Sequence, residues 1–355
     1  MKNILFFIVL NPCFVLGQIL KPYKITGYST FYNNKDIVFA PAILDAKYYE
    51  SNINIRTITV KNKKFELLGN IRYPTPAFFS YLIKEENRGV LSDLFFIDQG
   101  NLNIEIKDLT NKDKGFGSTL KSKSNREYEQ LKAIYKHLES ENDLRRIELK
   151  NVEAKDEILA AYIKNNPNSY VAMWDLIIDY KNFGYSKLID SISKFFSAKI
   201  KQTKAYRTFA ANLKVDRSLS LDKTFPFDKF SFGEKLSRKV RQQKYTLIEF
   251  WASFCKPCID TFPSLVELYT AYKLKGFDIY GISIDRENEI KRMKKIIHEK
   301  EIVWTNILDD NGKESKKINV DGIPRNFLLD SSGKILAKDI SSEDLKLFLR
   351  ERLSH

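Results

Sequence analysis

Residues 247–258 read Leu-Ile-Glu-Phe-Trp-Ala-Ser-Phe-Cys-Lys-Pro-Cys, and this stretch decides the fold of the second half of the chain. Residues 245–251 form an apolar run with the length and composition of a buried strand. Residues 258–272 then carry apolar side chains at helical spacing. The cysteines Cys255 and Cys258 therefore stand where a predicted strand gives way to a predicted helix.

This location favours reactive cysteines. At a helix N-terminus, the unpaired backbone N–H groups and the helix dipole stabilise a thiolate, and Lys256 adds a neighbouring cation. Pro257 is tolerated in a first helical turn, because the N–H group it lacks would have no partner there. A lowered pKa would make Cys255 the nucleophile at neutral pH. Cys258, one turn further along, could then resolve a mixed disulfide.

Two other interpretations of the cysteine pair are less favourable. A zinc site needs two more Cys or His ligands, and the histidines His137, His298 and His355 all lie far from the pair in sequence. A purely structural disulfide is disfavoured because a spacing of three residues closes almost no loop. We therefore expect redox chemistry without a metal or a cofactor.

The sequence around the pair continues the α/β pattern over residues 220–355. A second strand is predicted at residues 277–284 and a second helix at 287–300. Apolar runs at residues 327–329 and 335–336 flank the turn residues 330–333, which predicts a hairpin. Ser341 caps a final helix, with Asp344 at the capping-box position. Alternating strands and helices followed by a hairpin and a helix describe the thioredoxin fold.

The first half of the chain has a different pattern. Residues 18–110 contain short alternating segments separated by turns, which predicts an all-β, sandwich-like domain. Within it, residues 94–97 and 102–106 are expected to form a hairpin. From residue 118 to 215 the apolar period becomes helical, and we interpret this segment as a scaffold. The fold class is therefore multidomain, with an all-β domain, a helical middle segment and an α/β domain.

The ends and the composition of the chain bear on its location. Residues 1–17 contain a basic residue near the start, Lys2, then an apolar stretch too short to span a bilayer, and then the small residue Gly17. This order is typical of a secretory signal peptide. A buried N-terminal strand and a lipid anchor on Cys13 are the alternatives. The formal charge of +14 is spread over the chain among 45 acidic residues, which argues against a nucleic-acid groove.

The second half resembles the TlpA-like thiol–disulfide oxidoreductases of the thioredoxin superfamily. The matching residues are Phe250-Trp251-Ala252, the Cys-Lys-Pro-Cys motif, Pro263 and Gly322-Ile323-Pro324. The chain departs from the family pattern at Phe254 and Lys256, which bears on the reduction potential, and at Arg325, which bears on the choice of partner.

The resemblance implies further site residues. Pro324 would be a cis proline beside the disulfide, and Trp251, Ile323 and Arg325 would contact the substrate. Glu249 matches the family's buried acid, which could take a proton from Cys258. The alternative for Glu249 is a charge that faces solvent.

The first half resembles an N-terminal β-domain of unknown function that precedes thioredoxin modules in bacterial envelope proteins. These resemblances imply an exported enzyme of the periplasm or cell envelope that reduces disulfides. Its partners would be disulfide-containing envelope proteins and an upstream electron donor at the membrane, with no nucleic acid and no metal. A thiol peroxidase, and a binding module with a redox-sensing pair, are the alternative functions.

Overall fold

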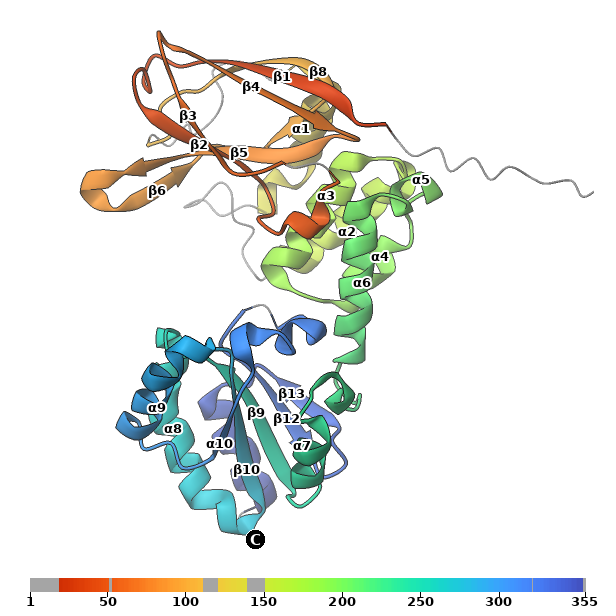
Figure 1. Cartoon of the computed structure of the whole chain (residues 1–355). Helices are drawn as coiled ribbons and strands as arrows, with labels where there is room; N and C mark the ends of the chain where they lie inside the picture. Colours follow the sequence, from red (N-terminus) through yellow and green to blue (C-terminus); the bar gives the residue numbers. More distant parts are fainter. Residues whose placement is uncertain (1–18, 51–52, 111–120, 139–150, 321, 354–355) are drawn as a thin grey trace, which may run out of the picture. The chain divides into compact units, whose positions relative to one another are not determined.

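A computed structural model describes residues 19–50, 53–110, 121–138, 151–320 and 322–353 (Figure 1). The predicted signal peptide, residues 1–17, lies outside the described residues. The chain divides into two compact units, Met1–Phe209 and Ala210–His355. The predicted boundaries at residues 110, 118, 215 and 220 stay predictions. Within the described residues, no helix is both long enough and apolar enough to cross a membrane.

The first unit contains two sheets. One has the strand order β4-β1-β8, and the other has the order β3-β2-β5-β6, with β7 also paired to β5. Gly27 in β1 is required by packing, because a Cβ atom there would lie 1.9 Å from the Phe65 ring on the paired strand β4. The strands are β1 (Lys21–Tyr28), β2 (Asp36–Pro41), β3 (Arg56–Thr59), β4 (Lys64–Ile71), β5 (Thr75–Ile83), β6 (Arg88–Leu91), β7 (Phe95–Ile97) and β8 (Gly100–Glu105).

The hairpin predicted for residues 94–106 is wrong. β7 pairs antiparallel with β5, whereas β8 pairs parallel with β1 in the other sheet. All three residues of β7 are buried, and the side chain of Asn125 bonds to both the N–H and the carbonyl of Phe96. The chain then turns at Gly100, whose positive φ of 89° favours glycine, and continues as β8 in the sheet that contains β1.

Helices follow these strands in the first unit. The side chains of Ser122, Ser169, Ser186 and Ser197 cap the N-termini of four of them. Helix α3 packs against the strands through Trp174, which donates a hydrogen bond to the carbonyl of Pro74. The helices are α1 (Lys123–Tyr135), α2 (Val152–Asn165), α3 (Tyr170–Phe183), α4 (Lys187–Ser193) and α5 (Ala198–Lys201). The boundary between the units falls within the next helix, α6 (Lys204–Ser218).

The second unit is built on one five-stranded sheet of order β11-β10-β9-β12-β13. Its strands are β9 (Tyr245–Trp251), β10 (Phe277–Ser283), β11 (Thr305–Leu308), β12 (Arg325–Asp330) and β13 (Ile335–Lys338). β9, β10 and β11 run parallel, whereas β12 is antiparallel to both β9 and β13. The predicted order of strands, helices, hairpin and final helix is confirmed, and with it the thioredoxin fold of this region. Sequence reasoning missed β11 and helix α7 (Gly233–Val240).

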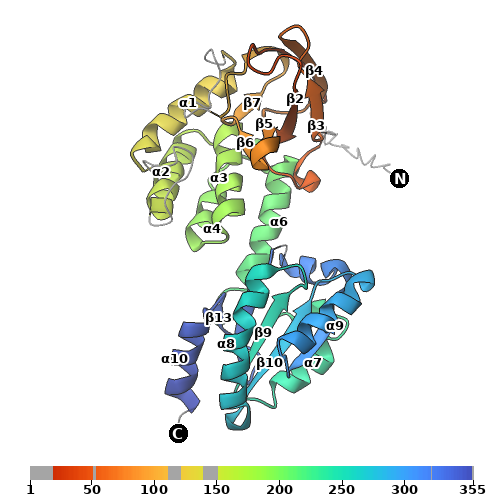
Figure 2. The same cartoon turned by 90° about the vertical axis from the view of Figure 1, so that its left-hand side faces the viewer.

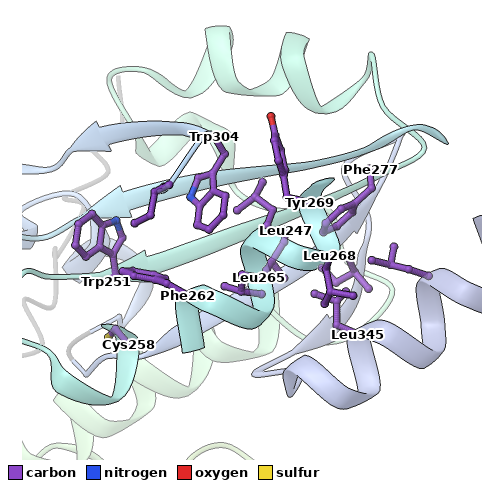
Figure 3. Close-up of a cluster of buried hydrophobic side chains, with 14 of the residues drawn as sticks. Leu247, Trp251, Cys258, Phe262, Leu265, Leu268, Tyr269, Phe277, Trp304 and Leu345 are labelled. Atoms are coloured by element: carbon purple, nitrogen blue, oxygen red, sulfur yellow. The ribbon is translucent and has the colours of Figure 1, made fainter. Parts of the chain in front are cut away.

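Each face of this sheet is covered by helices (Figure 2). One buried cluster joins Leu247 and Trp251 of β9 to α8 (Lys256–Tyr272), α9 (Ile290–Glu299) and α10 (Ser342–Leu353), and it contains both cysteines. Figure 3 shows part of this cluster, with Cys258 at one end. The opposite cluster joins Ile248 and Phe250 to α7. Because side chains alternate along a strand, Glu249 points to the same side as Leu247 and Trp251.

A buried ion cluster holds α2 and α3 together in the first unit. The ammonium of Lys155 lies 2.7 Å from both carboxylate oxygens of Asp179 and 3.3 Å from Asp175, and all three residues are buried. Burial alone would lower the pKa of Lys155, but the two carboxylates raise it above its usual value. The predicted scaffold therefore contains charges that sequence periodicity did not reveal.

Replacing Lys155 with Met should destabilise the first unit. The variant keeps the apolar stem but leaves two buried carboxylates without their cation, which typically costs about 3–5 kcal/mol. Urea unfolding followed by circular dichroism measures the change. Lys181→Met, at an exposed lysine of α3, is the control and should change stability little. Equal stability of the two variants would show that the cluster contributes nothing.

Candidate functional site

The cysteine pair sits at the junction of β9 and α8. Cys255 is the N-cap of α8 and has extended backbone angles, and its Sγ accepts a hydrogen bond from the N–H of Cys258 at 3.3 Å. The two residues form a disulfide with an S–S distance of 2.03 Å. Cys255 is 7% exposed and Cys258 is fully buried. Of the two sulfurs, that of Cys255 is therefore the one an external molecule can reach.

A buried carboxylate holds the loop that leads to Cys255. Asp285 accepts hydrogen bonds from the N–H and the hydroxyl of Ser253, at 2.9 and 2.7 Å, and from the hydroxyl of Ser283 at 2.6 Å. Sequence reasoning missed this residue. Its position in the sequence, directly after the second predicted strand, could have indicated it. The carboxyl ends of neighbouring parallel strands lie at the same edge of a sheet, so Asp285 could be expected near the loop that leads to Cys255.

Lys256 does not act on the cysteines as an isolated cation. Its ammonium bonds to both carboxylate oxygens of Asp260, at 3.0 and 2.7 Å, one helical turn further along α8. The pair is largely exposed, with 83% of the Lys256 side chain accessible. Asp260 therefore offsets part of the cationic field that the sequence assigned to Lys256.

Trp251 lies in the core. It is fully buried, its indole N–H donates to Asn306 Oδ1 at 3.0 Å, and its ring meets Phe262 edge-on at a centroid distance of 5.1 Å (Figure 3). The side chain has no exposed surface, and the expected contact with substrate stays a prediction. Its place beneath the junction of β9 and α8 gives it a packing role.

The segment before β12 approaches the same region. The Ile323–Pro324 peptide bond is cis. Ile323 packs against the buried cluster that contains both cysteines. Arg325 lies opposite Phe250 in the sheet register, and its Nε is 3.2 Å from Asp339 Oδ1. The guanidinium side chain is 37% exposed, so it remains accessible beside the end of β9.

Glu249 is a buried acid. It is 2% exposed, which excludes the solvent-facing alternative. Its Oε2 has no hydrogen-bond partner within the described part of the chain. Burial raises the pKa of Glu249 to about 8, although a hydrogen bond with Asn326 of the neighbouring strand works in the opposite direction. The carboxyl group is therefore largely protonated at neutral pH.

Comparison with known proteins places the second unit among redox enzymes. Residues 222–338 match the model of the AhpC/TSA family. The chain is 32% identical over 121 residues to the thiol-disulfide oxidoreductase ResA of Bacillus thuringiensis subsp. konkukian, a match covering 34% of this chain and 68% of that protein. It is 27% identical over 123 residues to sporulation thiol-disulfide oxidoreductase A of Bacillus subtilis, covering 34% of this chain and 74% of that one.

Solved structures give matches of similar extent. A thiol:disulfide interchange protein from Bacteroides sp. is 34% identical, with 32% of this chain and 76% of that chain covered and a TM-score of 0.30. A thiol-disulfide oxidoreductase from Bacteroides fragilis is also 34% identical, with 31% and 82% covered and a TM-score of 0.29. Each of these matches covers about a third of the chain.

Glu249 should make the stability of the second unit depend on pH. Its pKa is raised from 4.5 to about 8 in the folded chain, so between these values the folded state binds more protons than the unfolded state. The free energy of unfolding should therefore fall as the pH rises, by up to about 1.4 kcal/mol per pH unit. Glu249→Gln should flatten this slope in urea titrations of the oxidised protein. Glu267→Gln, at an exposed glutamate of α8, should retain it.

Removing Asp260 should lower the pKa of the Cys255 thiol. Asp260→Asn removes an anion from the N-terminal part of α8 and frees Lys256, and both changes favour the thiolate. We expect a decrease of roughly 0.2–0.7 units, as for other partly exposed charges near a helix terminus. The rate of alkylation of the reduced protein by iodoacetamide, measured against pH, gives this value. A pKa that rises or stays constant would contradict the assigned role of the ion pair.

Proposed function

Because the chain belongs to the thiol–disulfide oxidoreductases, we propose that it reduces disulfides of cell-envelope proteins through Cys255 and Cys258. The observation that carries this proposal is the asymmetry of the pair. Cys255 is the N-cap of α8 and the more accessible cysteine, whereas Cys258 is fully buried one turn along. This arrangement provides one sulfur for attack on a substrate and a second for release.

The proposed reaction balances as two exchanges. The Cys255 thiolate attacks one sulfur of a substrate disulfide, and the other substrate sulfur leaves as a thiolate. Cys258 loses its proton and attacks Cys255 Sγ, which breaks the mixed disulfide and releases the second substrate sulfur. The substrate gains two electrons, and the enzyme is left with the Cys255–Cys258 disulfide. An upstream dithiol donor at the membrane then returns two electrons to the enzyme.

Glu249 is the proposed proton acceptor for Cys258. It lies buried on the face of β9 that points toward the cluster containing both cysteines. Because its pKa is about 8, the carboxyl group is mostly protonated at neutral pH, so its ionised fraction would take the proton and the protonated group would return it. The unpartnered Oε2 leaves one oxygen available for such a transfer.

Ile323 and Arg325 are the proposed contacts for the substrate chain. Both belong to the segment that enters β12, next to the end of β9 that leads to Cys255. The backbone of Ile323 would pair with an extended substrate segment. Arg325 would exchange its contact with Asp339 for a substrate carboxylate, since the side chains of Arg325 and Asp339 are both partly exposed.

The proposed location is the periplasm or cell envelope. It rests on the signal-like residues 1–17 and on the resemblance of the first half to a domain of envelope proteins. An oxidising compartment of this kind is where protein disulfides form and persist, and hence where a reductase has substrates.

Reduction of insulin tests the proposed reaction. With dithiothreitol as the donor, the chain should accelerate insulin precipitation over dithiothreitol alone, and Cys255→Ser should abolish that acceleration. Cys258→Ser should accumulate a mixed disulfide with an insulin chain, visible on a non-reducing gel, because the resolving sulfur is missing. Cys13→Ser is the matched control and should retain full turnover. A wild-type chain that gives no acceleration would overturn the proposal, and peroxide consumption in its place would favour a thiol peroxidase.

A further inference from the structure

We propose that the end of the second unit opposite the cysteine pair binds the surface of an anionic phospholipid bilayer. Six exposed basic residues gather there, and we call this group the cationic pole. They come from the last turn of α7, from the turn before β9 and from the turn after α8: Arg238, Lys239, Arg241, Lys244, Lys273 and Lys275.

Hydrogen bonds and packing bring these segments together. The N–H groups of Lys244 and Tyr245 both donate to the carbonyl of Gly276, at 2.8 and 3.0 Å. The side chain of Lys244 lies against Gly276, at 3.0 Å from where a Cβ atom would stand. Tyr245 meets Phe348 of α10 at a centroid distance of 5.0 Å, and Arg352 lies over that ring. The last turn of α10 therefore lies at the same end of the sheet.

Few acids offset this charge within the described residues. Glu234 is 3.6 Å from Arg238. Asp278 is partly buried and interacts with the hydroxyls of Tyr280 and Tyr269. Glu351 is exposed in the last turn of α10, between Arg350 and Arg352. Basic residues thus outnumber acidic ones at this end, which makes it attractive to an anionic surface.

An exposed leucine favours lipid as the occupant. Leu274 is 98% exposed and lies between Lys273 and Lys275. The ammonium groups of these two lysines lie over the rings of Tyr269 and Tyr272, at 4.9 and 5.6 Å from the ring centroids. An apolar side chain surrounded by lysines can enter the boundary between headgroups and acyl chains while the cations contact phosphate groups. Nucleic acid would instead need free aromatic faces for stacking, which the lysines cover here.

The pole lies far from the redox site in the same unit. β9 runs from Tyr245 at the pole to Trp251 near Cys255, a distance of about 20 Å for a strand of this length. α8 returns from Lys256 to Tyr272 over about 25 Å. A membrane bound at the pole would therefore leave the cysteine pair facing away from the lipid, open to envelope proteins. The inference does not depend on the redox activity.

Vesicle binding tests the proposal on the full chain. We expect cosedimentation with vesicles of phosphatidylcholine and phosphatidylglycerol in equal amounts, weaker binding to phosphatidylcholine alone, and loss of binding at high salt. The triple variant Arg241→Gln, Lys244→Gln and Lys275→Gln should lower the partition coefficient roughly a hundredfold, since each basic residue near an anionic leaflet strengthens binding about fivefold. Its insulin reduction should stay unchanged, which separates a failure of this proposal from a failure of the proposed function.

A matched variant controls for net charge. The control is a triple variant with the substitutions Lys291→Gln, Arg292→Gln and Lys294→Gln, which removes the same charge from exposed residues in the first half of α9. This helix follows the end of β10 that lies away from the cationic pole, so the variant should retain binding. Equal loss in the two triple variants would overturn the proposal, because net charge would then explain the binding. Leu274→Ser should weaken binding without changing its salt dependence. A single-stranded oligonucleotide bound more tightly than the vesicles, through the same three residues, would overturn the assignment to lipid.

Discussion

The central place of β9 in the sheet of the second unit is the constraint on which the redox site depends. All seven residues of β9 pair with β10 on one side, and six of them pair with β12 on the other. β9 is therefore held from both sides as far as Phe250, and Trp251 is held by its pairing with Ser283 of β10 and by the hydrogen bond of its indole to Asn306. The four-residue path to Cys255 starts from this point. Asp285 then holds Ser253 by its N–H and its hydroxyl, which fixes the middle of that path. The start of α8, and with it the N-cap position of Cys255, follows from this support rather than from the cysteines themselves.

The same constraint explains how much could be predicted from the sequence. The strand at residues 245–251 and the helix that follows have strong local periodicity, and the elements predicted around them are confirmed. β11 was missed because its four residues carry only partly buried or exposed side chains, so no apolar run marks it. The hairpin predicted at residues 94–106 was wrong because β7 pairs with β5 and β8 pairs with β1, each more than a dozen residues away in sequence. Local turn residues do not indicate such distant strand pairing. Asp285 and Asn306 reach the site only through the tertiary fold.

Two buried ionisable groups show how differently the two units treat charge. In the first unit, Lys155 has two carboxylate partners, and these keep its ammonium group charged. Burying the three groups costs the free energy of removing them from water. In the second unit, Glu249 has no cation beside it and one oxygen without a hydrogen bond in the described structure. Buried polar groups in proteins are almost always partnered, so an exception calls for an explanation. The proposed role in proton transfer would account for an acid at this position, where an apolar residue would pack at lower cost.

The raised pKa of Glu249 also bears on the direction of electron flow. At neutral pH the carboxyl group is mostly neutral and does not repel a thiolate at Cys255, whereas above its pKa of about 8 it adds a second negative charge to the same buried face. That charge disfavours the thiolate and therefore the reduced form of the pair. A pair whose reduced form is destabilised gives up electrons more readily. Asp260 acts in the same direction at the surface by engaging the Lys256 ammonium. At neutral pH Asp260 therefore opposes the helix dipole that favours the thiolate, and Glu249 joins it only above its pKa of about 8. Both effects would favour the proposed direction of electron flow, from the cysteine pair to a substrate disulfide.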